Sequence, residues 1–201
     1  MKRVSIITDK KLINEMLKSA VYGTLALAAN KKPYAVPVNY VYYKDAIYFH
    51  SSPKGKKMRI LAKNNQVSFN IVCDDIFIPS YFSSDDGLAC PASAFFKSII
   101  IDGKTEIIKD YDELREVFSV LMQSLQPDGK YKHFDNSEYN KEFKALVLVK
   151  INIESLTAKF KYGQNMAKKR QQMVIKHLKQ RGRKIDLLTI DAIKQFSKHK
   201  L

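Results

Sequence analysis

The sequence has no tryptophan, and its 201 residues include only seven glycines and two cysteines. The glycines form neither a GxGxxG fingerprint nor a GxxxxGK[ST] loop, so the usual signatures of dinucleotide and nucleoside-triphosphate sites are missing. Cys73 and Cys90 are too few for a disulfide framework, and neither they nor the scattered histidines have the spacing of metal ligands. There is no GxSxG nucleophile elbow. Nothing in the sequence therefore supports a hydrolase or a metalloenzyme, and we expect no metal site.

Long hydrophobic stretches are also lacking. No apolar run is long enough to cross a bilayer, and the first residues, MKRVSIITDKK, contain no hydrophobic signal region. We therefore expect a cytoplasmic protein without a membrane contact. Its length and its 45% apolar content suit one domain with a core of its own, or a domain with an appendage.

The net charge of +15 is concentrated near the C-terminus. Residues 141–201 carry sixteen Lys/Arg and four Asp/Glu, whereas the rest of the chain carries nineteen and sixteen. A basic segment suggests a nucleic-acid or acidic partner. However, its two expected helices, residues 164–180 and one capped by Asp186, have apolar stripes that suit packing. We therefore predict a domain of residues 1–160 and a basic helical extension of residues 161–201, and we do not expect nucleic acid as a partner.

The alternation of apolar residues predicts six strands joined mostly by short turns. Pro37 within the second strand indicates a sheet edge or a bulge. Asp102-Gly103 within the fifth indicates a bulge or a hairpin turn, and the bulge is preferred because the apolar run resumes immediately. Helices are expected after Thr8 or Asp9 and after Asp110. This pattern favours an α+β fold, a small, largely antiparallel barrel with added helices, over a parallel doubly wound sheet. The expected strands are residues 22–29, 33–43, 46–50, 67–73, 95–109 and 145–153.

Residues 36–58, VPVNYVYYKDAIYFHSSPKGKKM, contain the strongest candidate for a binding site. Alternating residues on both sides of Lys44-Asp45 predict a β-hairpin that turns there. Ser52-Pro53 is a typical helix start, because serine suits the N-cap and proline suits the first helical position. The free N–H groups of a helix N-terminus favour an anion, and the lysines of residues 54–57 add positive charge. The stretch therefore predicts a phosphate site, with a solvated lysine face as the alternative.

Four segments carry a family resemblance: GTLAL from Gly23, PYAVPVNYVY from Pro33, IYFHSSPKGKK from Ile47 and SIIIDGKTEII from Ser98. Together they resemble the pyridoxamine 5'-phosphate oxidase-like FMN-binding split barrels, and in particular their nitroimidazole-reductase-like branch. The resemblance covers roughly residues 10–155 in order. It implies a six-stranded antiparallel split β-barrel that forms a homodimer, with FMN in each of two grooves at the subunit interface.

The resemblance also implies positions for the cofactor. The flavin ring is expected against residues 37–40, with His50 and Ser51 along the cofactor. The phosphate is expected at Ser52 and Lys57, the place that the predicted helix start also indicates. His50 is in addition the one candidate for a catalytic proton donor. The implied cofactor-binding residues are Pro37, Val38, Asn39, Tyr40, His50, Ser51, Ser52, Lys57, Ser98 and Lys104.

Several of these positions have equally simple structural interpretations. His50 at a strand end also suits a structural histidine, and Asn39 also suits hydrogen bonds to its own neighbours. The tyrosines that follow Asn39 suit a core or a dimer surface. Lys97 stands where the resemblance implies an aromatic residue, and residues after 165 lie outside the resemblance.

Three functional hypotheses follow. The first, which we take as the expectation, is an FMN-dependent oxidoreductase, nitroreductase-like, that passes electrons or hydride from a nicotinamide donor to a small organic acceptor. The second keeps the barrel but binds or degrades haem, with His177 and His199 as candidate haem contacts. The third is a basic nucleic-acid-binding module.

Overall fold

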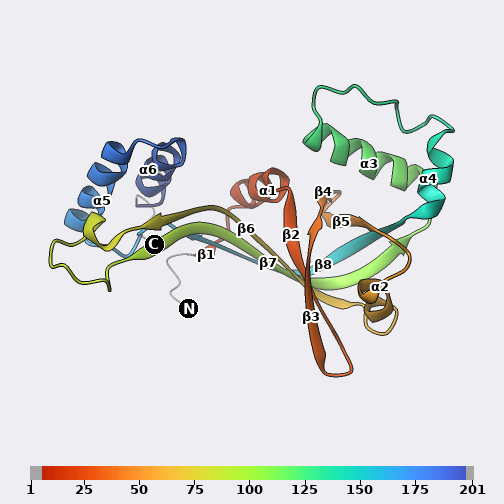
Figure 1. Ribbon diagram of the computed structural model, residues 1–201, viewed down its shortest axis with the longest axis horizontal. Helices are drawn as coiled ribbons and strands as arrows, with labels where there is room; N and C mark the ends of the chain where they lie inside the picture. Colours follow the sequence, from red (N-terminus) through yellow and green to blue (C-terminus); the bar gives the residue numbers. More distant parts are fainter. Residues whose placement is uncertain (1–5, 198–201) are drawn as a thin grey trace. The chain divides into compact units, whose positions relative to one another are not determined.

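The computed structural model of the chain describes residues 6–197, except for the side chains of Asp74 and Asp75. The strands are β1 (Ile6–Ile7), β2 (Tyr22–Ala29), β3 (Lys32–Asn39), β4 (Val41–Tyr43), β5 (Ala46–Ser51), β6 (Gln66–Ile78), β7 (Ser93–Ile108) and β8 (Val147–Lys161). The helices are α1 (Lys10–Ser19), α2 (Lys56–Leu61), α3 (Tyr111–Leu125), α4 (Tyr139–Ala145), α5 (Lys168–Arg181) and α6 (Lys184–Ser197), with a 3₁₀ turn at Ser80–Phe82. Figure 1 shows their order along the chain.

The strands form one eight-stranded sheet in the order β3-β2-β6-β7-β8-β5-β4, with β1 paired to β8. The pairings of β1 with β8, β2 with β3 and β6, and β5 with β4 and β8 are all antiparallel. This confirms the predicted α+β fold class, an antiparallel split barrel with added helices. The strand count differs from the six expected.

One added strand arises where the expected strand 33–43 divides at Tyr40. Its first part, β3, pairs with β2, and its second part, β4, pairs with β5. Tyr40 lies between them, and its backbone N–H donates to the carbonyl of Val21. The chain therefore changes partners at this residue, which the local sequence pattern does not reveal. The prediction that Pro37 marks a sheet edge is confirmed, since β3 ends the sheet order.

The strands β6 and β8 extend beyond the predicted residues 73 and 153. In β6, Ile76 and Ile78 are buried while Phe77 is exposed, so the alternation resumes after two aspartates. In β8, Ala158 and Phe160 are buried beyond the polar residues in the middle of the strand. Both predictions are too short because polar residues, which usually mark the end of a strand, lie within these long strands.

The structure separates into two compact units. The first unit comprises the described parts of residues 1–9, 72–98 and 158–201, and the second comprises residues 10–71 and 99–157. The predicted boundary between residues 160 and 161 stays a prediction. In the second unit, α3 packs its buried Leu114, Val117 and Leu121 into a cluster with residues of β4, β5 and β8. The N-cap of α3 is Asp110 as predicted, because its side chain accepts hydrogen bonds from the backbone N–H groups of Asp112 and Glu113.

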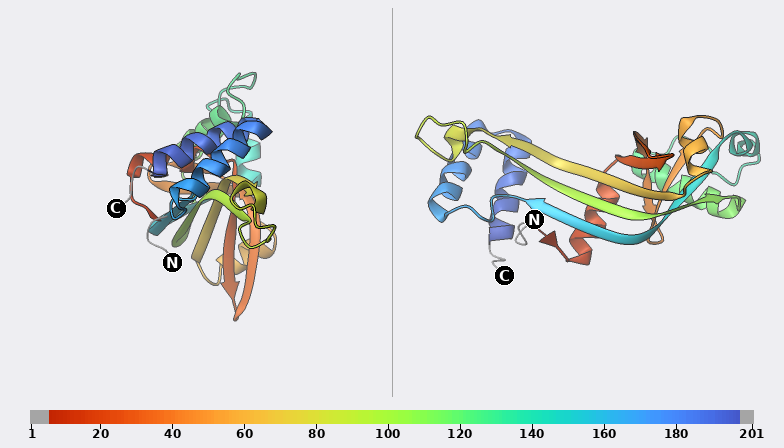
Figure 2. Two further views of the ribbon diagram at one scale, coloured as in Figure 1. Left: turned by 90° about the vertical axis from the view of Figure 1, so that its left-hand side faces the viewer. Right: turned by 90° about the horizontal axis from the view of Figure 1, so that it is seen from below.

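The first unit contains the basic helices α5 and α6, which lie side by side (Figure 2). Val174 and Leu178 of α5 are buried, as are Ile190, Ile193 and Phe196 of α6. The ring of Phe196 stacks on Tyr162 with centroids 5.7 Å apart. Most of the apolar stripes predicted for this segment are therefore core, but Leu187, which was expected in the second stripe, is 55% exposed. The lysines of both helices remain on the surface.

The boundary between these helices corrects one prediction. Helix α5 ends at Arg181 and is capped by Gly182, whose φ of 69° suits glycine, and α6 begins at Lys184. Asp186 was expected to be the cap residue of this helix. It lies instead inside the first turn of α6. Its buried carboxylate instead accepts hydrogen bonds from the backbone N–H of Arg183 and from the side chains of Arg181 and Arg183.

Gly103 lies in the middle of β7, where a bulge was expected. A Cβ atom added at this residue would overlap the backbone carbonyl oxygen of Asn152 in β8. Because a backbone atom cannot move aside cheaply, we expect Gly103→Ala to destabilise the protein by about 1–3 kcal/mol. Urea unfolding measures this change. The neighbouring exposed substitution Asp102→Ala is the control, with an expected change within about 0.5 kcal/mol; equal effects at both positions would contradict the close-approach explanation.

Candidate functional site

The hairpin of the candidate stretch forms as the sequence predicts. Val41 pairs with Tyr48 and Tyr43 with Ala46, so the turn consists of Lys44 and Asp45. Both turn residues have positive φ, 44° and 57°, the backbone that a tight hairpin needs. β5 then continues to Ser51 and pairs on its other side with β8. His50 and Ser51 lie at the end of β5, beyond its pairing with β4, and are held there by β8, where they pair with Leu148 and Val147.

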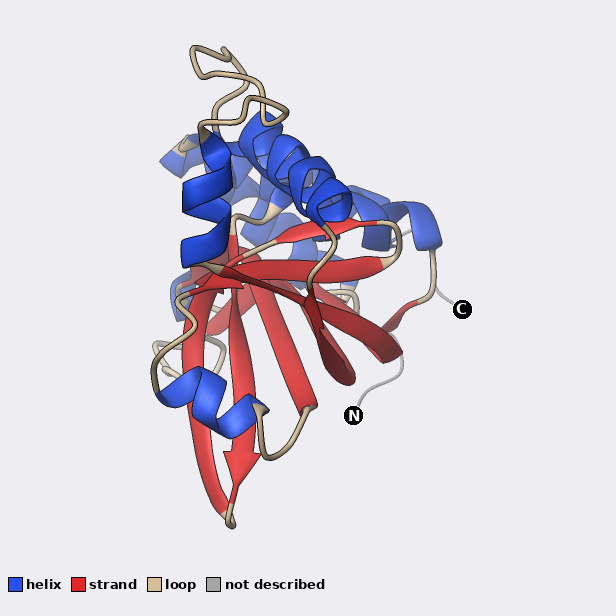
Figure 3. Ribbon diagram, turned by 90° about the vertical axis from the view of Figure 1, so that its right-hand side faces the viewer, coloured by secondary structure: helices blue, strands red, loops and turns tan. Residues whose placement is uncertain are grey.

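The helix start predicted at Ser52-Pro53 is wrong. Helix α2 has only six residues, its N-cap is Gly55, and it lies beside β2 (Figure 3). Gly55 has a φ of 132°, which a helical residue cannot adopt, so the helix begins only after it. The Ser52 hydroxyl instead accepts a hydrogen bond from the backbone N–H of Lys54, at 3.3 Å. A phosphate site here must therefore depend on side chains more than on a helix terminus.

Lys57 and His50 form a pair of basic side chains next to this bend. The Lys57 ammonium lies 5.1 Å from the centroid of the Phe49 ring, and its partial burial lowers its pKa. The His50 ring lies 5.7 Å from the ring of Phe118 in α3. Although His50 keeps contact with solvent, partial burial lowers its pKa, and the charge of Lys57 lowers it further. Among the side chains that the structure describes, no carboxylate forms an ion pair with Lys57, so none of them compensates its positive charge.

This coupling predicts a measurable change at His50. Because burial is the larger cause and Lys57 the smaller, Lys57→Met is expected to raise the pKa of His50 while leaving it below its ordinary value. An NMR pH titration of the imidazole resonances measures both effects. The exposed lysine variant Lys63→Met is the control and should leave the pKa of His50 unchanged. An unchanged His50 pKa in Lys57→Met would show that the two side chains do not interact.

The residues expected against the flavin ring are largely engaged in the fold. The Tyr40 hydroxyl is buried and donates to the carbonyl of Leu17 at 2.9 Å. The Asn39 amide donates at 3.2 Å to the carbonyl of Val21, which is 18 residues away and is therefore not one of the sequence neighbours that its structural interpretation expected. Val38 is nearly buried, and Pro37 is exposed. The part of this strand best suited to a ligand is therefore the backbone of β3, whose outer edge is not paired with another strand in the described structure.

The family comparison identifies the fold. A family model described as pyridoxamine 5'-phosphate oxidase matches residues 9–160, three quarters of the chain. The chain belongs to the pyridoxamine 5'-phosphate oxidase family. The predicted family is thereby confirmed, and the match includes all of the candidate stretch.

Solved structures agree with this family. A 5-nitroimidazole antibiotic resistance protein from Bacteroides thetaiotaomicron is 23% identical, with a TM-score of 0.62 over 77% of this chain and 85% of that one. The flavocytochrome Anf3 from Azotobacter vinelandii is 17% identical, with a TM-score of 0.64 over 80% and 72%. An FAD- and haem-binding protein from Mycobacterium smegmatis is 19% identical, with a TM-score of 0.64 over 78% and 73%. At these identities the likeness shows the fold. No curated protein matches the chain.

The remaining predicted cofactor residues of this family member lie in different surroundings. Ser51 is buried, and its hydroxyl donates to the carbonyl of Ser52 at 3.1 Å. Lys104 forms an exposed ion pair with Glu154 at 2.7 Å. Ser98 belongs to the first compact unit, where it is half-buried in β7. The structure thus brings together His50, Ser51 and Lys57 with the neighbouring bend.

Two aromatic residues at this site were not among the predicted site residues. The ring centroid of Tyr34 in β3 lies 4.2 Å from the ammonium of Lys56. Phe118 of α3 contacts the His50 ring, and the helix predicted after Asp110 did not indicate this contact. Tyr34 lies on the same face of β3 as Val36 and Val38. The alternation of side chains along the strand was therefore the sequence signal that could have indicated its position.

The described residues contain neither a metal-binding cluster nor a membrane-spanning helix. Residues 6–197 contain no group of three or more His, Cys, Asp and Glu side chains that is suited to hold a metal ion. In the same part of the chain, none of the helices has the length and apolarity that a membrane span needs.

Proposed function

We propose that the protein is an FMN-binding oxidoreductase that transfers hydride or electrons from a nicotinamide donor to a small organic acceptor. Membership of the pyridoxamine 5'-phosphate oxidase family supports a flavin role. The observation that carries the proposal is the Lys57–His50 pair, two partly buried basic groups without a carboxylate partner in the described structure. A cytoplasmic location is part of the same proposal.

The chemistry of this pair fits a phosphate monoester. Burial without a counter-charge makes the charged form of Lys57 less favourable, and a bound dianion removes that penalty. Hydrogen bonds between an ammonium and a phosphate are also stronger than neutral ones. The Ser52 hydroxyl and the exposed bend before α2 supply further donors at the same end of β5. The residues therefore suit the phosphate of FMN.

When bound, the flavin supplies the hydride-transfer chemistry. The chain supplies binding and orientation: Lys57 and Ser52 hold the phosphate end, and the backbone of residues 37–40 lies along the ring system. His50 is placed to hold a proton. Its lowered pKa keeps the imidazole largely neutral at neutral pH, so one ring nitrogen can donate a hydrogen bond and the other can accept one.

A homodimer belongs to the proposal because the second unit exposes several large apolar side chains. Tyr22 is 65% exposed, and Val21, Ile100 and Ile107 are about half exposed. Apolar surface of this kind, if contiguous, suits a protein interface. Sedimentation equilibrium measures the oligomeric state, and a monomer at micromolar concentration would contradict this part of the proposal.

The visible absorption spectrum of the purified protein tests the proposal. We expect flavin bands, or the quenching of FMN fluorescence when FMN is titrated into colourless protein. A protein that takes up neither FMN nor FAD would refute it, whereas preference for FAD would change only the identity of the flavin.

A haem Soret band without flavin would favour the alternative cofactor. The flavocytochrome Anf3 and the Mycobacterium smegmatis protein that binds FAD and haem make this alternative relevant. In the present structure the His177 ring stacks on Phe82 at 4.9 Å and 19°, which is a packing role, and His199 lies outside the described residues. No contact of His177 favours haem over flavin.

A further inference from the structure

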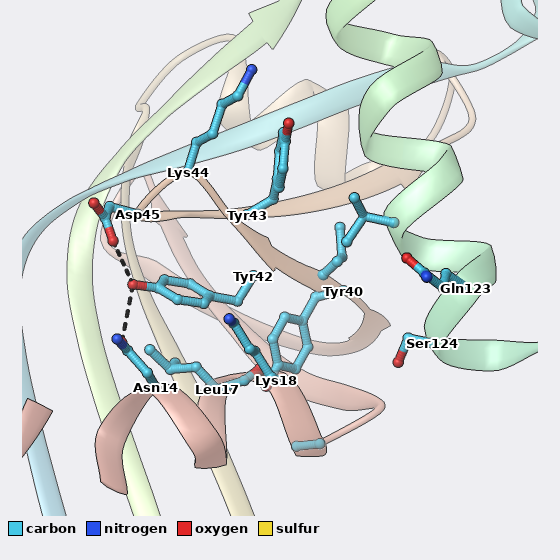
Figure 4. Close-up of a pocket in the computed structure, with 13 residues that line it drawn as sticks. Asn14, Leu17, Lys18, Tyr40, Tyr42, Tyr43, Lys44, Asp45, Gln123 and Ser124 are labelled. Atoms are coloured by element: carbon cyan, nitrogen blue, oxygen red, sulfur yellow. Dashed lines mark hydrogen bonds between the residues drawn. The ribbon is translucent and has the colours of Figure 1, made fainter. Parts of the chain in front are cut away.

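The cavity between α1, the β4–β5 hairpin and α3 carries nearly balanced charge (Figure 4). Its lining includes Lys18, Lys44 and Asp45. Glu116 pairs with Lys44 at 2.7 Å, so the carboxylates match the two ammonium groups in number. Tyr40 lines the cavity and is also one of the residues expected along the flavin ring. The cavity therefore adjoins the candidate flavin stretch and does not indicate a separate anion site.

The charge is distributed differently on the sheet of the first unit. Lys159 and Lys161 lie two residues apart in β8, so both side chains point to the same face of the sheet. Phe160 between them points to the other face, where the centroid of its ring lies 5.6 Å from that of Phe196 in α6. The two lysines, which we call the lysine pair, therefore lie on the face of β8 opposite to α6, where both are half-buried.

The neighbouring strand β7 holds the lysine pair in place. The ammonium of Lys159 lies 5.8 Å from the centroid of the Phe96 ring, and the ammonium of Lys161 lies 6.0 Å from it. The Lys161 ammonium also donates a hydrogen bond to the hydroxyl of Ser93 at 2.8 Å. Two ammonium groups are thus gathered beside one aromatic ring, and a hydroxyl anchors one of them.

No carboxylate compensates the lysine pair. Among the side chains that the structure describes, neither Lys159 nor Lys161 has an ion-pair partner. Partial burial lowers the pKa of Lys161, and the charge of Lys159 lowers it further. Two like charges that lie close together repel each other, and half-burial removes part of the water that would stabilise them. A bound anion would relieve both penalties.

We propose that the lysine pair binds a phosphate group, either as free phosphate or as the phosphate of a small monoester. A phosphate monoester carries about 1.5 to 2 negative charges at neutral pH, which matches two ammonium groups. An ammonium group has three N–H donors, so Lys161 keeps two of them after its hydrogen bond to Ser93. Hydrogen bonds from these donors to phosphate are charge-assisted and therefore stronger than neutral ones.

The proposal goes beyond the flavin function and does not depend on it. The lysine pair belongs to the first compact unit, whereas His50, Ser52 and Lys57 belong to the second. The Phe96 ring adds apolar surface beside the two ammonium groups, which suits the organic part of an aromatic monoester.

Inorganic phosphate tests this site in an NMR titration of the whole protein. The amide signals of Ser93, Phe96 and Lys161 report binding at the lysine pair, and chloride at the same ionic strength is the reference. We expect these signals to shift and saturate with phosphate but not with chloride. Lys159→Met and Lys161→Met should each weaken phosphate binding by about 10-fold, the effect of losing one charge-assisted hydrogen bond at a partly exposed site. The control Lys179→Met removes an exposed, unpaired lysine of α5 and should change the affinity by less than about 2-fold.

Phenyl phosphate distinguishes the two sources of the phosphate group. Tighter binding than that of inorganic phosphate would assign a monoester whose organic part contacts Phe96, and equal binding would assign free phosphate. Thermal unfolding shows whether each variant remains folded. If Lys161→Met does not, Lys159→Met still decides, together with Lys161→Arg, which keeps the charge and should retain binding.

Three results would overturn the proposal: no shift of these signals with phosphate, equal shifts with chloride, or unchanged phosphate affinity in Lys159→Met. Displacement of phosphate from these residues by equimolar FMN would also overturn it, because the lysine pair would then be part of the flavin site.

Discussion

Replacing Lys57 by methionine is expected to weaken FMN binding by about 10- to 100-fold. A hydrogen bond to a charged group contributes about 1.5–3 kcal/mol, which corresponds to a change of this size in the dissociation constant. Methionine keeps most of the length and apolar surface of the lysine stem, so the packing beside Phe49 is largely retained. Quenching of FMN fluorescence in a titration measures the effect.

The matched control is Lys63→Met, just after the same helix, where the side chain is exposed. It removes the same charge from the protein but should change FMN affinity by less than about 2-fold, since exposed charges are screened by salt. Riboflavin, which lacks the phosphate, adds a second comparison. If Lys57→Met weakened riboflavin and FMN binding equally, Lys57 would act on the ring or on the fold, and the phosphate assignment would be wrong.

Replacing Asp186 by alanine is expected to destabilise the protein by about 3 kcal/mol. Its carboxylate has no exposed surface and accepts hydrogen bonds from Arg181 at 2.8 and 3.0 Å and from Arg183 at 3.0 and 3.1 Å. Removing one partner from a buried charge network leaves the others without compensation, although here the arginines are partly exposed and regain some hydration. Urea unfolding measures the loss. Asp191→Ala, on the exposed face of the same helix, should change stability by no more than about 0.5 kcal/mol.

The same carboxylate predicts a pH dependence. Burial alone would raise the pKa of Asp186, but the hydrogen bonds from Arg181 and Arg183 outweigh it and hold the pKa well below its usual range. The unfolded chain therefore binds this proton more tightly than the folded one. The contribution of Asp186 is fully present above the unfolded pKa of about 4 and is lost as the pH falls below it. The stability difference between wild type and Asp186→Ala should accordingly shrink in acid, and a constant difference would contradict the network.

The features that could be predicted from the sequence depend on neighbouring residues. Three local predictions were correct: the turn at Lys44-Asp45, the N-cap at Asp110 and the edge position of Pro37. Each is determined by side-chain chemistry within a few residues. The family followed from motifs spread along the chain, and the family model confirms it.

The errors arise where a distant or stronger constraint overrides a local one. Ser52-Pro53 has the chemistry of a helix start, but Gly55 adopts a φ of 132° and delays the helix. Tyr40 continues the alternation of a strand, yet the chain changes partners there because its N–H bonds to Val21. The contact of His50 with Phe118 joins residues far apart in sequence, so no local pattern could have indicated it.

The order of strands in the sheet also bears on synthesis at the ribosome. β5 pairs only with its hairpin neighbour β4 and with β8, in which Asn152 lies opposite Ala46, about 100 residues later. Such distant pairing is slow because a long loop must close before its contacts form. His50 and Ser51 therefore lack their final pairing until Val147 and Leu148 of β8 have emerged. A nascent chain halted before β8 would display an unpaired β5 edge, which is a surface open to chaperones and to aggregation.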